Sequence, residues 1–454
     1  MRIGDEQVVR ALGEWRRPGV PLLTSLAGAL REAVLDGRLR TGGELPAERR
    51  LAAALGVSRG TVTAALAVLR DGGWVRTRHG SASTVRLPPR PAEPVAPLTA
   101  TGETGRIDLR RAVPAAPGAA YLAATLRAAE RAGPLLAEGG EPDAGLPELR
   151  ALLAARYTAE GLPTRPEQIL VTAGARAALA LLAGHLRPRA AAVEVPTYFD
   201  ALRVLRGAGA RLAGCRVGTD GWDPDQLGTA FTAAAGGLAY LVPDFQNPTG
   251  ALMTAATRRA VAALAARHRV TLVVDETMRG LDLRDTPRPA PRIRGAVLIG
   301  SPSKAVWGGL RVGWIRGPAA LIGALRHDPL GAPLAAAPMQ QLIAAELFGG
   351  EEAVLRHRRA ELRRQRDHLC ALLAGDGRWR FDVPPGGLAL WLRLTEARAD
   401  TVVARAGADG LALLPGQSFA ADGTLVHHLR VPYTPPPAVL DRIAAVLDRA
   451  CPRG

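Results

Sequence analysis

The stretch GSPSKAVWGGLRVGW, from Gly300 to Trp314, contains the only lysine of the chain, Lys304. Lysine and arginine together number 58, so the other 57 are arginine. A guanidinium stays protonated and is a poor nucleophile, whereas an amine can lose its proton and attack a carbonyl to form a Schiff base. A single lysine in such a chain indicates either a position that requires an amine or a surface lysine that has survived by chance. The residues around Lys304 are needed to distinguish these two explanations.

Length and composition limit the class of protein. The chain has 454 residues, of which 48% are hydrophobic, and this predicts two or three domains with a large core. It has no run of 18 or more apolar residues and no apolar leader segment, so we expect a cytoplasmic protein without a membrane span. Three scattered cysteines predict neither disulfides nor a metal site. The net charge of +16 is compatible with nucleic-acid binding, but general enrichment in arginine produces it too.

The chain divides into three segments. We expect residues 1–86 to form a helical unit that ends in a short hairpin, and residues 87–106, rich in Pro, Thr and Gly, to form a linker. From residue 107 to residue 454, short apolar runs alternate with helical stretches, which predicts an α/β domain with a mostly parallel sheet covered by helices. The apolar runs are 168–172, 191–195, 238–242, 270–275 and 296–300.

The N-terminal segment has the pattern of a helix-turn-helix. Helical segments at 45–55 and 59–73 flank a tight turn, and Ser58 is a suitable N-cap for the second helix. That helix would lie in the major groove, where Arg59 can pair with a guanine edge. Residues 74–86 follow as a two-stranded wing. The segment contains 14 arginines against 8 acidic residues, clustered at the turn, the third helix and the wing, which favours DNA binding over a packing role.

The phrases LPAERRLAAALGVSRGTV and GWVRTRHG resemble the winged helix-turn-helix (α+β) domain of GntR-type regulators. The resemblance implies binding to a double-stranded DNA operator. One departure is the wing, which reads Gly80-Ser81-Ala82-Ser83 where the family often has GxGT. The resemblance implies that DNA is contacted by Arg49, Ser58, Arg59, Gly60, Thr63, His79 and Gly80. We expect two further arginines of the basic wing, Arg76 and Arg78, to contact DNA as well.

Groups that suit a phosphorylated aldehyde surround Lys304. The amine can take the carbonyl, while Ser301, Ser303 and Arg311 can hold the phosphate. Upstream, the stretch VTAGARAAL runs from a strand through Gly174 into a helix. Free backbone N–H groups at such a helix start bind phosphate well.

Three further segments supply groups for a flat heterocycle. VVDET ends a strand at Asp275, which can pair with a protonated pyridine nitrogen. DFQNPTG supplies Asn247, whose amide can donate to a phenolate oxygen, and EVPTYF supplies Tyr198, whose ring can stack on the heterocycle. Each segment alone has an ordinary explanation as a turn, a helix cap or a core residue. Together with the only lysine they form a specific set.

In this order the segments resemble the fold-type I pyridoxal-phosphate aminotransferases over residues 107–454, a fold with a smaller α+β C-terminal subdomain. The resemblance implies that Lys304 forms a Schiff base with pyridoxal 5'-phosphate and that Asp275 pairs with its pyridine nitrogen. Asn247 then reaches the ring oxygen, Tyr198 stacks on the ring, and Arg430 in HHLRVPY binds a substrate carboxylate. The phosphate is assigned to Gly174, Ala175, Arg176, Ser301, Ser303 and Arg311.

A GntR-type head joined to an aminotransferase-like body resembles the MocR/GabR family of transcription regulators, and the phrases DFQNPTG, VVDETM and SKAVWGGLRVGW favour its YczR-type branch. The family implies a head-to-tail homodimer. There are two departures. Thr277 and Met278 stand where many members have a tyrosine, which leaves Thr277 as the candidate donor to the ring oxygen. No aromatic residue occurs around residues 139–145, where the family has one that reaches the partner's phosphate.

Three functions follow from these patterns. The first is a transcription regulator that binds DNA and senses pyridoxal phosphate, or an amine or amino acid that reacts with it. The second is an active aminotransferase with a vestigial DNA-binding head. The third is a dimerisation scaffold that has lost its cofactor. The basic residues of the head argue against the second function, and the retained lysine argues against the third.

Overall fold

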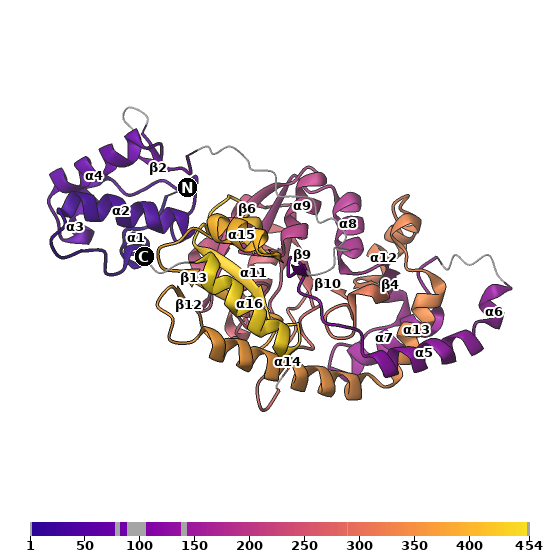
Figure 1. The fold of residues 1–454 in the computed structure, drawn as a ribbon. Helices are drawn as coiled ribbons and strands as arrows, with labels where there is room; N and C mark the ends of the chain where they lie inside the picture. The colour runs from indigo at the N-terminus through magenta and orange to yellow at the C-terminus, as the bar shows by residue number, and fades with distance from the viewer. Residues whose placement is uncertain (1, 78–81, 89–105, 138–142, 288, 452–454) are drawn as a thin grey trace.

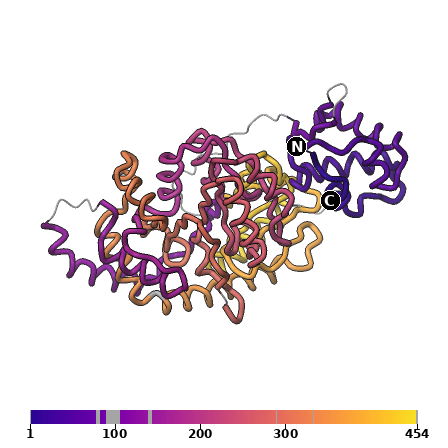
Figure 2. Tube along the Cα trace, turned by 180° about the vertical axis from the view of Figure 1, so that it is seen from behind, coloured from indigo at the N-terminus to yellow at the C-terminus, as the bar shows by residue number. Residues whose placement is uncertain are grey.

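The computed structural model describes residues 2–77, 82–88, 106–137, 143–287 and 289–451 (Figure 1). A small N-terminal unit, which we call the head, lies at one end of a larger unit, which we call the body. In both views the head lies beside the C-terminal part of the body, near α15 (Ala399–Ala408) and β13 (Ala389–Leu394) (Figures 1 and 2). No single helix among the described residues has the length and apolar character to cross a membrane. The helices α3 (Glu48–Leu55) and α4 (Arg59–Asp71) have that length and character only when taken together, and they are bent by 114° relative to each other.

The head contains the predicted helix-turn-helix. Its helices are α1 (Asp5–Leu12), α2 (Leu22–Leu35), α3 (Glu48–Leu55) and α4 (Arg59–Asp71). Gly56 ends α3 in the left-handed conformation at φ 62°, which glycine adopts without a steric penalty. The Ser58 hydroxyl caps α4 by accepting a hydrogen bond from the Thr61 amide at 3.1 Å, as the sequence predicts. The inward face of α4 is buried at Val62, Ala65, Leu66 and Leu69.

The wing is a short antiparallel hairpin. Its strands are β1 (Val75–Arg76) and β2 (Thr84–Val85), paired with Val75 opposite Val85. Both valines are buried in the core of the head, which fixes the hairpin against the helices. The predicted wing tip at residues 78–81 lies outside the described residues.

An eight-stranded sheet forms the centre of the body, in the order β4-β11-β10-β9-β8-β5-β6-β7. The pairs from β10 through β6 are parallel, and the outer pairs are antiparallel, so the sheet is mostly parallel as predicted. All five predicted apolar runs belong to it. The strands are β4 (Ile169–Thr172), β5 (Ala190–Val195), β6 (Arg211–Gly218), β7 (Gly221–Trp222), β8 (Leu238–Leu241), β9 (Thr271–Asp275), β10 (Val297–Gly300) and β11 (Gly313–Arg316).

Helices cover both faces of this sheet, because its central strands are apolar on both sides. The long helix α14 (Glu351–Leu373) runs along the body towards the C-terminal subdomain (Figure 1). The others are α5 (Gly118–Glu130), α6 (Gly133–Leu136), α7 (Pro147–Ala159), α8 (Ala175–Leu186), α9 (Phe199–Gly207), α10 (Pro224–Ala233), α11 (Ala255–His268), α12 (Ala319–Arg326) and α13 (Pro338–Gly349).

The smaller C-terminal subdomain contains an antiparallel sheet in the order β12-β13-β16-β15, packed with two helices. A separate parallel pair joins β3 (Ile107–Asp108) to β14 (Leu411–Ala412), so the chain that follows the linker becomes part of this subdomain. The remaining elements are β12 (Trp379–Arg380), β13 (Ala389–Leu394), α15 (Ala399–Ala408), β15 (Leu414–Pro415), β16 (His428–Pro432) and α16 (Pro437–Ala450).

The head contacts the body through the C-terminal end of α2. The Leu35 carbonyl accepts a hydrogen bond from the Leu425 amide at 2.5 Å, and the buried Asp36 carboxylate pairs with Arg393 at 2.9 Å. Glu32 lies 3.3 Å from the ring of His427. The His427 ring, through a hydrogen bond and its charge, holds the pKa of Glu32 below its usual range although burial opposes this. Burial would raise the pKa of Asp36, but cationic groups including Arg393 hold it below its usual range. Burial lowers the pKa of His428 to about 4, so that ring is neutral near neutral pH.

Candidate functional site

A cavity of about 550 Å³ lies where the central parallel strands end and the C-terminal subdomain begins. Carboxyl ends of parallel strands are the usual ligand site in open α/β sheets. The structure brings every body residue that the sequence singled out to the wall of this one cavity. These residues are Gly174, Ala175, Arg176, Tyr198, Asn247, Asp275, Thr277, Ser301, Ser303, Lys304, Arg311 and Arg430.

Lys304 is in the loop that follows β10, and its side chain enters the cavity. The Nζ atom donates a hydrogen bond to the Ala112 carbonyl at 2.9 Å. Burial lowers the pKa of Lys304 to about 8, and the charge of Arg430 acts in the same direction, while Asp275 opposes it. About a tenth of the amine is therefore unprotonated at pH 7, far more than for an ordinary lysine, and the unprotonated form is the nucleophile.

A glycine-lined cradle forms the wall of the cavity where α8 begins. Gly174 has φ 113° and precedes the helix, so the first amides of α8 face the cavity. A Cβ atom on Gly313 would lie 2.5 Å from the Gly174 backbone, which leaves no room for a side chain there. Arg311 adopts the left-handed conformation at φ 54°, and its guanidinium approaches Gly174. Free helix-start amides beside a guanidinium form a binding site for an anion.

The two predicted serines differ in their freedom to bind a ligand. The Ser301 hydroxyl donates to the Val312 carbonyl at 2.7 Å and accepts from the Ser303 amide at 3.2 Å. Ser301 therefore shapes the loop, while no described residue of the cavity wall accepts the hydroxyl proton of Ser303. Both side chains still line the cavity.

Asp275 ends β9 in the floor of the cavity. Its carboxylate accepts a hydrogen bond from the Tyr240 hydroxyl at 2.7 Å and one from the Thr277 amide at 2.8 Å. Sequence analysis missed Tyr240. A signal was present, because a tyrosine inside an apolar strand must find a partner for its hydroxyl, and Tyr240 is fully buried in β8.

A buried glutamate, Glu194, holds two loops that supply cavity residues. Burial raises the pKa of Glu194 to about 7, although its hydrogen bonds act in the opposite direction. The carboxylate connects the end of β5, which precedes Tyr198, to the loop that contains Asn247. Its donors are the Thr197 hydroxyl, the Trp222 indole, the Val242 amide and the Gln246 side chain.

Arg430 on β16 is buried at the side of the cavity. Its guanidinium donates to the Arg110 carbonyl at 2.7 Å and lies 4.7 Å from the Phe419 ring. Burial lowers the pKa of Arg430 to about 10, and its Nε atom has no partner among the described residues. No carboxylate of the described residues lies within ion-pair distance of it, so the cavity offers an uncompensated cation to an anionic ligand.

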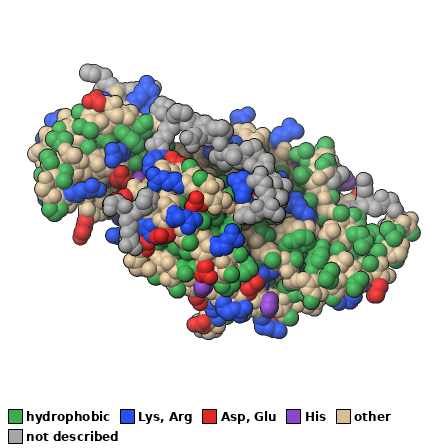
Figure 3. Space-filling model, viewed as in Figure 1, with side chains coloured by type: hydrophobic (Ala, Val, Ile, Leu, Met, Phe, Trp, Pro, Cys, Tyr) green, Lys and Arg blue, Asp and Glu red, His purple; other side chains and the backbone are tan. Residues whose placement is uncertain are grey.

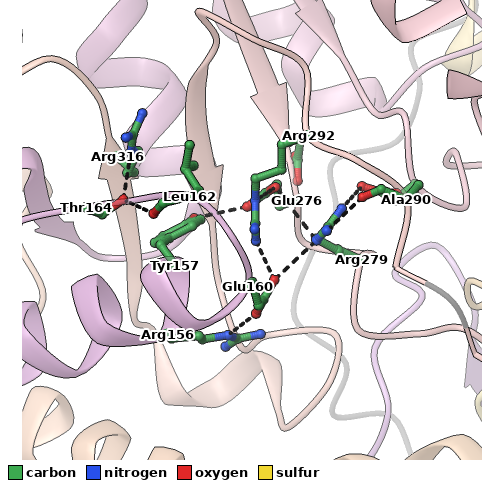
Figure 4. A network of polar contacts seen from close by, with 12 residues as sticks. Arg156, Tyr157, Glu160, Leu162, Thr164, Glu276, Arg279, Ala290, Arg292 and Arg316 are labelled. Atoms are coloured by element: carbon green, nitrogen blue, oxygen red, sulfur yellow. Dashed lines mark hydrogen bonds and ion pairs between the residues drawn. The ribbon is translucent and has the colours of Figure 1, made fainter. Parts of the chain in front are cut away.

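A network of charges behind the cavity fixes the chain where β9 ends (Figure 4). Glu276, the neighbour of Asp275, pairs with Arg292 at 2.7 Å, and Arg292 also pairs with Glu160 on α7 at 2.7 Å. Because Glu276 and Arg292 are largely buried, removing either would leave a charge without compensation. Further members are Tyr157, whose hydroxyl donates to Glu276 at 3.0 Å, and Arg156 and Arg279, which approach Glu160 at 3.2 and 3.6 Å.

Other cavity residues were not anticipated from the sequence. Arg111 lines the wall without an acidic partner among the described residues, and Asp200 accepts from the Tyr198 hydroxyl at 3.0 Å and pairs with Arg176 at 3.5 Å. Met278 is buried and lines the cavity, where the family pattern led us to look for a tyrosine. Arg111 gave no sequence signal among so many arginines.

The expected DNA-reading face of the head is organised around Glu48. Its carboxylate accepts from the Thr63 hydroxyl at 2.7 Å and lies 3.7 Å from the Arg59 guanidinium. This pairing presents both side chains at the start of α4. Predicted contact residues that are exposed are Arg49, Ser58, Arg59, Gly60, Thr63 and Arg76, whereas Arg78, His79 and Gly80 lie outside the described residues.

Comparison with family models matches both units. Residues 22–85 match the bacterial regulatory proteins of the gntR family, and residues 117–447 match aminotransferase class I and II. Among relatives, the chain is 31% identical to the HTH-type pyridoxine biosynthesis transcriptional regulator PdxR of Corynebacterium glutamicum, over 77% of each chain. It is 28% identical to the probable rhizopine catabolism regulatory protein MocR of Rhizobium meliloti, over 86% of this chain and 85% of that protein.

A solved structure supports the fold of the body. The α-aminoadipate aminotransferase LysN of Thermus thermophilus, complexed with N-(5'-phosphopyridoxyl)-L-leucine, aligns with a TM-score of 0.69 and 26% identity, covering 77% of this chain and 92% of that one. The predicted fold class, a winged helix followed by a fold-type I aminotransferase domain, is therefore confirmed.

Proposed function

The chain belongs to the MocR/GabR family of regulators, in which a GntR-type winged helix-turn-helix is fused to an aminotransferase-like domain, and we propose that it couples operator binding to the sensing of an amine or amino acid. We assign operator binding to residues 1–86, sensing to residues 107–454 and the connection to residues 87–106. The observation that supports this division best is the convergence of all twelve predicted body residues on one cavity, remote from the exposed arginines of the head.

Pyridoxal 5'-phosphate is the cofactor of the body, and the cavity fits it. The cavity contains one buried amine, an anion cradle at the start of α8 and a buried carboxylate at the end of β9. When bound, this cofactor supplies an aldehyde that reacts with amines and a ring that withdraws electrons. We propose Lys304 as the residue that attaches it.

The other residues of the cavity would orient the cofactor and the amine. We propose that the amides of Gly174, Ala175 and Arg176, with Arg311 and Ser303, hold the phosphate, and that Ser301 shapes this loop. Asp275, fixed by Tyr240 and Thr277, would accept the proton-bearing ring nitrogen. Asn247 would donate to the ring oxygen, Tyr198 would cover the ring, and Arg430 would bind the carboxylate of the ligand.

We favour a sensor over an aminotransferase with a vestigial head. The reading helix keeps its exposed arginine and threonine ordered by Glu48, which a vestigial head would have no reason to retain. In the cavity, Met278 has no hydroxyl to offer the ring oxygen, and this weakens the support for full turnover. We also infer a cytoplasmic location, which operator binding requires and three free cysteines suit.

We propose a homodimer formed through the outer face of α5 and α6. Leu122 and Leu126, one helical turn apart on α5, are 64% and 67% exposed, and Leu136 on α6 is 77% exposed. Apolar side chains gather over this end of the body in Figure 3. A contiguous exposed apolar patch marks an interaction surface, and a second copy of the chain is the partner that the family architecture implies.

The connection between the two ends runs through β16. Arg430 projects from this strand into the cavity, and His427 and His428 at its start face the head. The His428 ring stacks on Trp391 at 5.3 Å, and Phe419 contacts both Trp391 and Arg430. A ligand that engages Arg430 therefore acts on the elements that hold α2 of the head.

Lys304→Arg keeps the positive charge and removes the nucleophile. We expect pyridoxal phosphate followed by borohydride to leave no covalently attached cofactor on this variant, as measured by intact mass. In the wild type, the rate of attachment should rise with pH through about 8, where half of the amine is neutral, and level off about one pH unit higher. Covalent attachment to a side chain of the variant would refute the assignment, because the chain has no second lysine.

Arg59→Ala should cost about 1–3 kcal/mol on an operator selected from random duplexes and relax base preference at one position. Arg76→Ala, in the wing, is the matched control, because a phosphate contact should weaken specific and random DNA alike and lower the salt dependence. Both are measured by fluorescence anisotropy at several salt concentrations. Equal losses for Arg59→Ala on operator and random DNA would contradict its role as a base reader.

Leu126→Glu should convert the dimer into a monomer, because it places a charge in the apolar face at α5. Analytical ultracentrifugation over a concentration series measures the change. Leu372→Glu on α14, which alters a leucine that is 41% exposed, is the control and should leave the dimer intact. Unchanged association of Leu126→Glu would place the subunit interface elsewhere.

Operator affinity should differ between the cofactor-free protein, the protein with cofactor and the protein with cofactor and amino acid, by about 5- to 150-fold, a typical range for allosteric coupling. DNA should change ligand affinity by the same factor. Asp36→Asn weakens the contact between the head and Arg393 and should reduce this factor, whereas Asp409→Asn, at an exposed pair with Arg449, should not. Identical operator titrations in all three states would favour the aminotransferase with a vestigial head.

A further inference from the structure

The segment that supplies the carbonyl partners of Arg430 and Lys304 presents a second guanidinium, that of Arg111, to the same cavity. The Arg110 carbonyl accepts from Arg430 at 2.7 Å, and the Ala112 carbonyl accepts from Lys304 at 2.9 Å. Arg111 lies between these two anchors and its side chain lines the cavity. The backbone around it is thus fixed by Arg430, which would bind the carboxylate of an amino acid, and by Lys304, which would attach the cofactor.

Arg111 has no ion-pair partner among the described residues, although its charge helps to lower the pKa of the Asp108 carboxylate. Its neighbour Arg110 is held by the Asp108 carboxylate, with contacts at 2.9 and 2.7 Å, so that acid is already occupied. Arg176 pairs with Asp200 at 3.5 Å. No hydrogen bond or ion pair links Arg111 to another described residue, and its side chain is exposed at the rim.

The cavity consequently has one cation more than pyridoxal phosphate and a simple amino acid would use. The phosphate engages the cradle with Arg311, the ring nitrogen engages Asp275, and the α-carboxylate engages Arg430. Arg111 remains, close enough to Lys304 that its charge contributes to the lowered pKa of that amine. Guanidinium groups bind carboxylates through two parallel hydrogen bonds and hold them in a defined orientation.

We propose that the effector is an amino acid with a second carboxylate, bound with its α-carboxylate at Arg430 and its distal carboxylate at Arg111. The inference rests on the proposed function of the cavity and adds the class of ligand. Arg111 would also exclude amino acids with a basic side chain by like-charge repulsion. It would act as a specificity-determining residue, because its exposed side chain lines the cavity while the two residues beside it are anchored by Arg430 and Lys304.

The test compares acidic amino acids with neutral analogues on the full-length protein loaded with pyridoxal phosphate. L-Aspartate is paired with L-asparagine, L-glutamate with L-glutamine, and L-2-aminoadipate with L-norleucine. Each is titrated by the change in the cofactor absorption band and, independently, by its effect on operator affinity. We expect at least one acidic member to bind about 10- to 100-fold more tightly than its neutral partner, which is the usual range for a charged hydrogen bond.

Arg111→Gln should abolish this preference while leaving the affinity for the neutral analogues unchanged. Arg111→Glu should reverse it towards L-lysine and L-ornithine. Arg267→Gln removes the same charge from an exposed position on α11 and is the control that should keep the preference. Because Arg111 is exposed, neither variant should alter the melting temperature.

The outcomes separate the two proposals. Equal binding of acidic and neutral amino acids by the wild type, or a preference that survives Arg111→Gln, would overturn the role of Arg111 while the sensing function stands. A uniform change for all ligands in Arg111→Gln would assign to Arg111 only an effect on the Lys304 amine and would likewise overturn the proposal. If no amino acid alters the absorption band or operator affinity, both the sensing function and this inference fail.

Discussion

The two buried cations of the cavity, Lys304 and Arg430, are held by backbone carbonyls and not by carboxylates. Lys304 donates to the Ala112 carbonyl and Arg430 donates to the Arg110 carbonyl, both in the segment that enters the body after the linker. A carbonyl satisfies a hydrogen-bond donor but does not neutralise its charge, so burial remains unfavourable for the protonated form. The lowered pKa values of both residues, about 8 and about 10, follow from this arrangement.

Two consequences follow for the site. A buried amine with a lowered pKa is available as a nucleophile, and a buried guanidinium without a counter-ion gains most from an anionic ligand. Both depend on the placement of residues 109–112, which is set by the pairing of β3 with β14 in the C-terminal subdomain. The same segment begins where the linker from the head ends. The position of the head, the shape of the cavity mouth and the charge of its lining are therefore connected through one short stretch of chain.

Much of this organisation could be predicted from the sequence. The helix-turn-helix followed from apolar spacing and the Ser58 cap, and the five central strands followed from apolar runs, because both patterns are local. The sequence did not reveal the roles of Tyr240, Glu194 or the charge network around Arg292, because their partners are distant in the sequence. Tyr240 on β8 meets Asp275 on the neighbouring strand β9, and Glu276 meets Arg292 and Tyr157 from separate elements. Arg111 could not be recognised from the sequence because it is one of 57 arginines. Its role becomes apparent only when the structure shows which neighbouring charges are already paired.

The charged residues behind the cavity are paired with one another, whereas Arg430 and Arg111 in the cavity wall are not. This difference would allow one part of the fold to stay rigid while another responds to a ligand. Behind the cavity, Glu276, Arg279 and Arg292 are largely buried and are mutually compensated together with the more exposed Glu160, so they fix the end of β9 whatever occupies the site. In the cavity wall itself, Arg430 and Arg111 lack ion-pair partners among the described residues. The electrostatic energy of these two guanidinium groups would therefore change when an anionic ligand binds. Since Arg430 shares β16 with His428, which lies near Asp36 of the head, we propose that a change in the electrostatic state of Arg430 is transmitted to the contact between head and body. A ligand can shift such an equilibrium only by its differential affinity for the two arrangements. We propose that Arg430 and Arg111 are the groups that supply that difference.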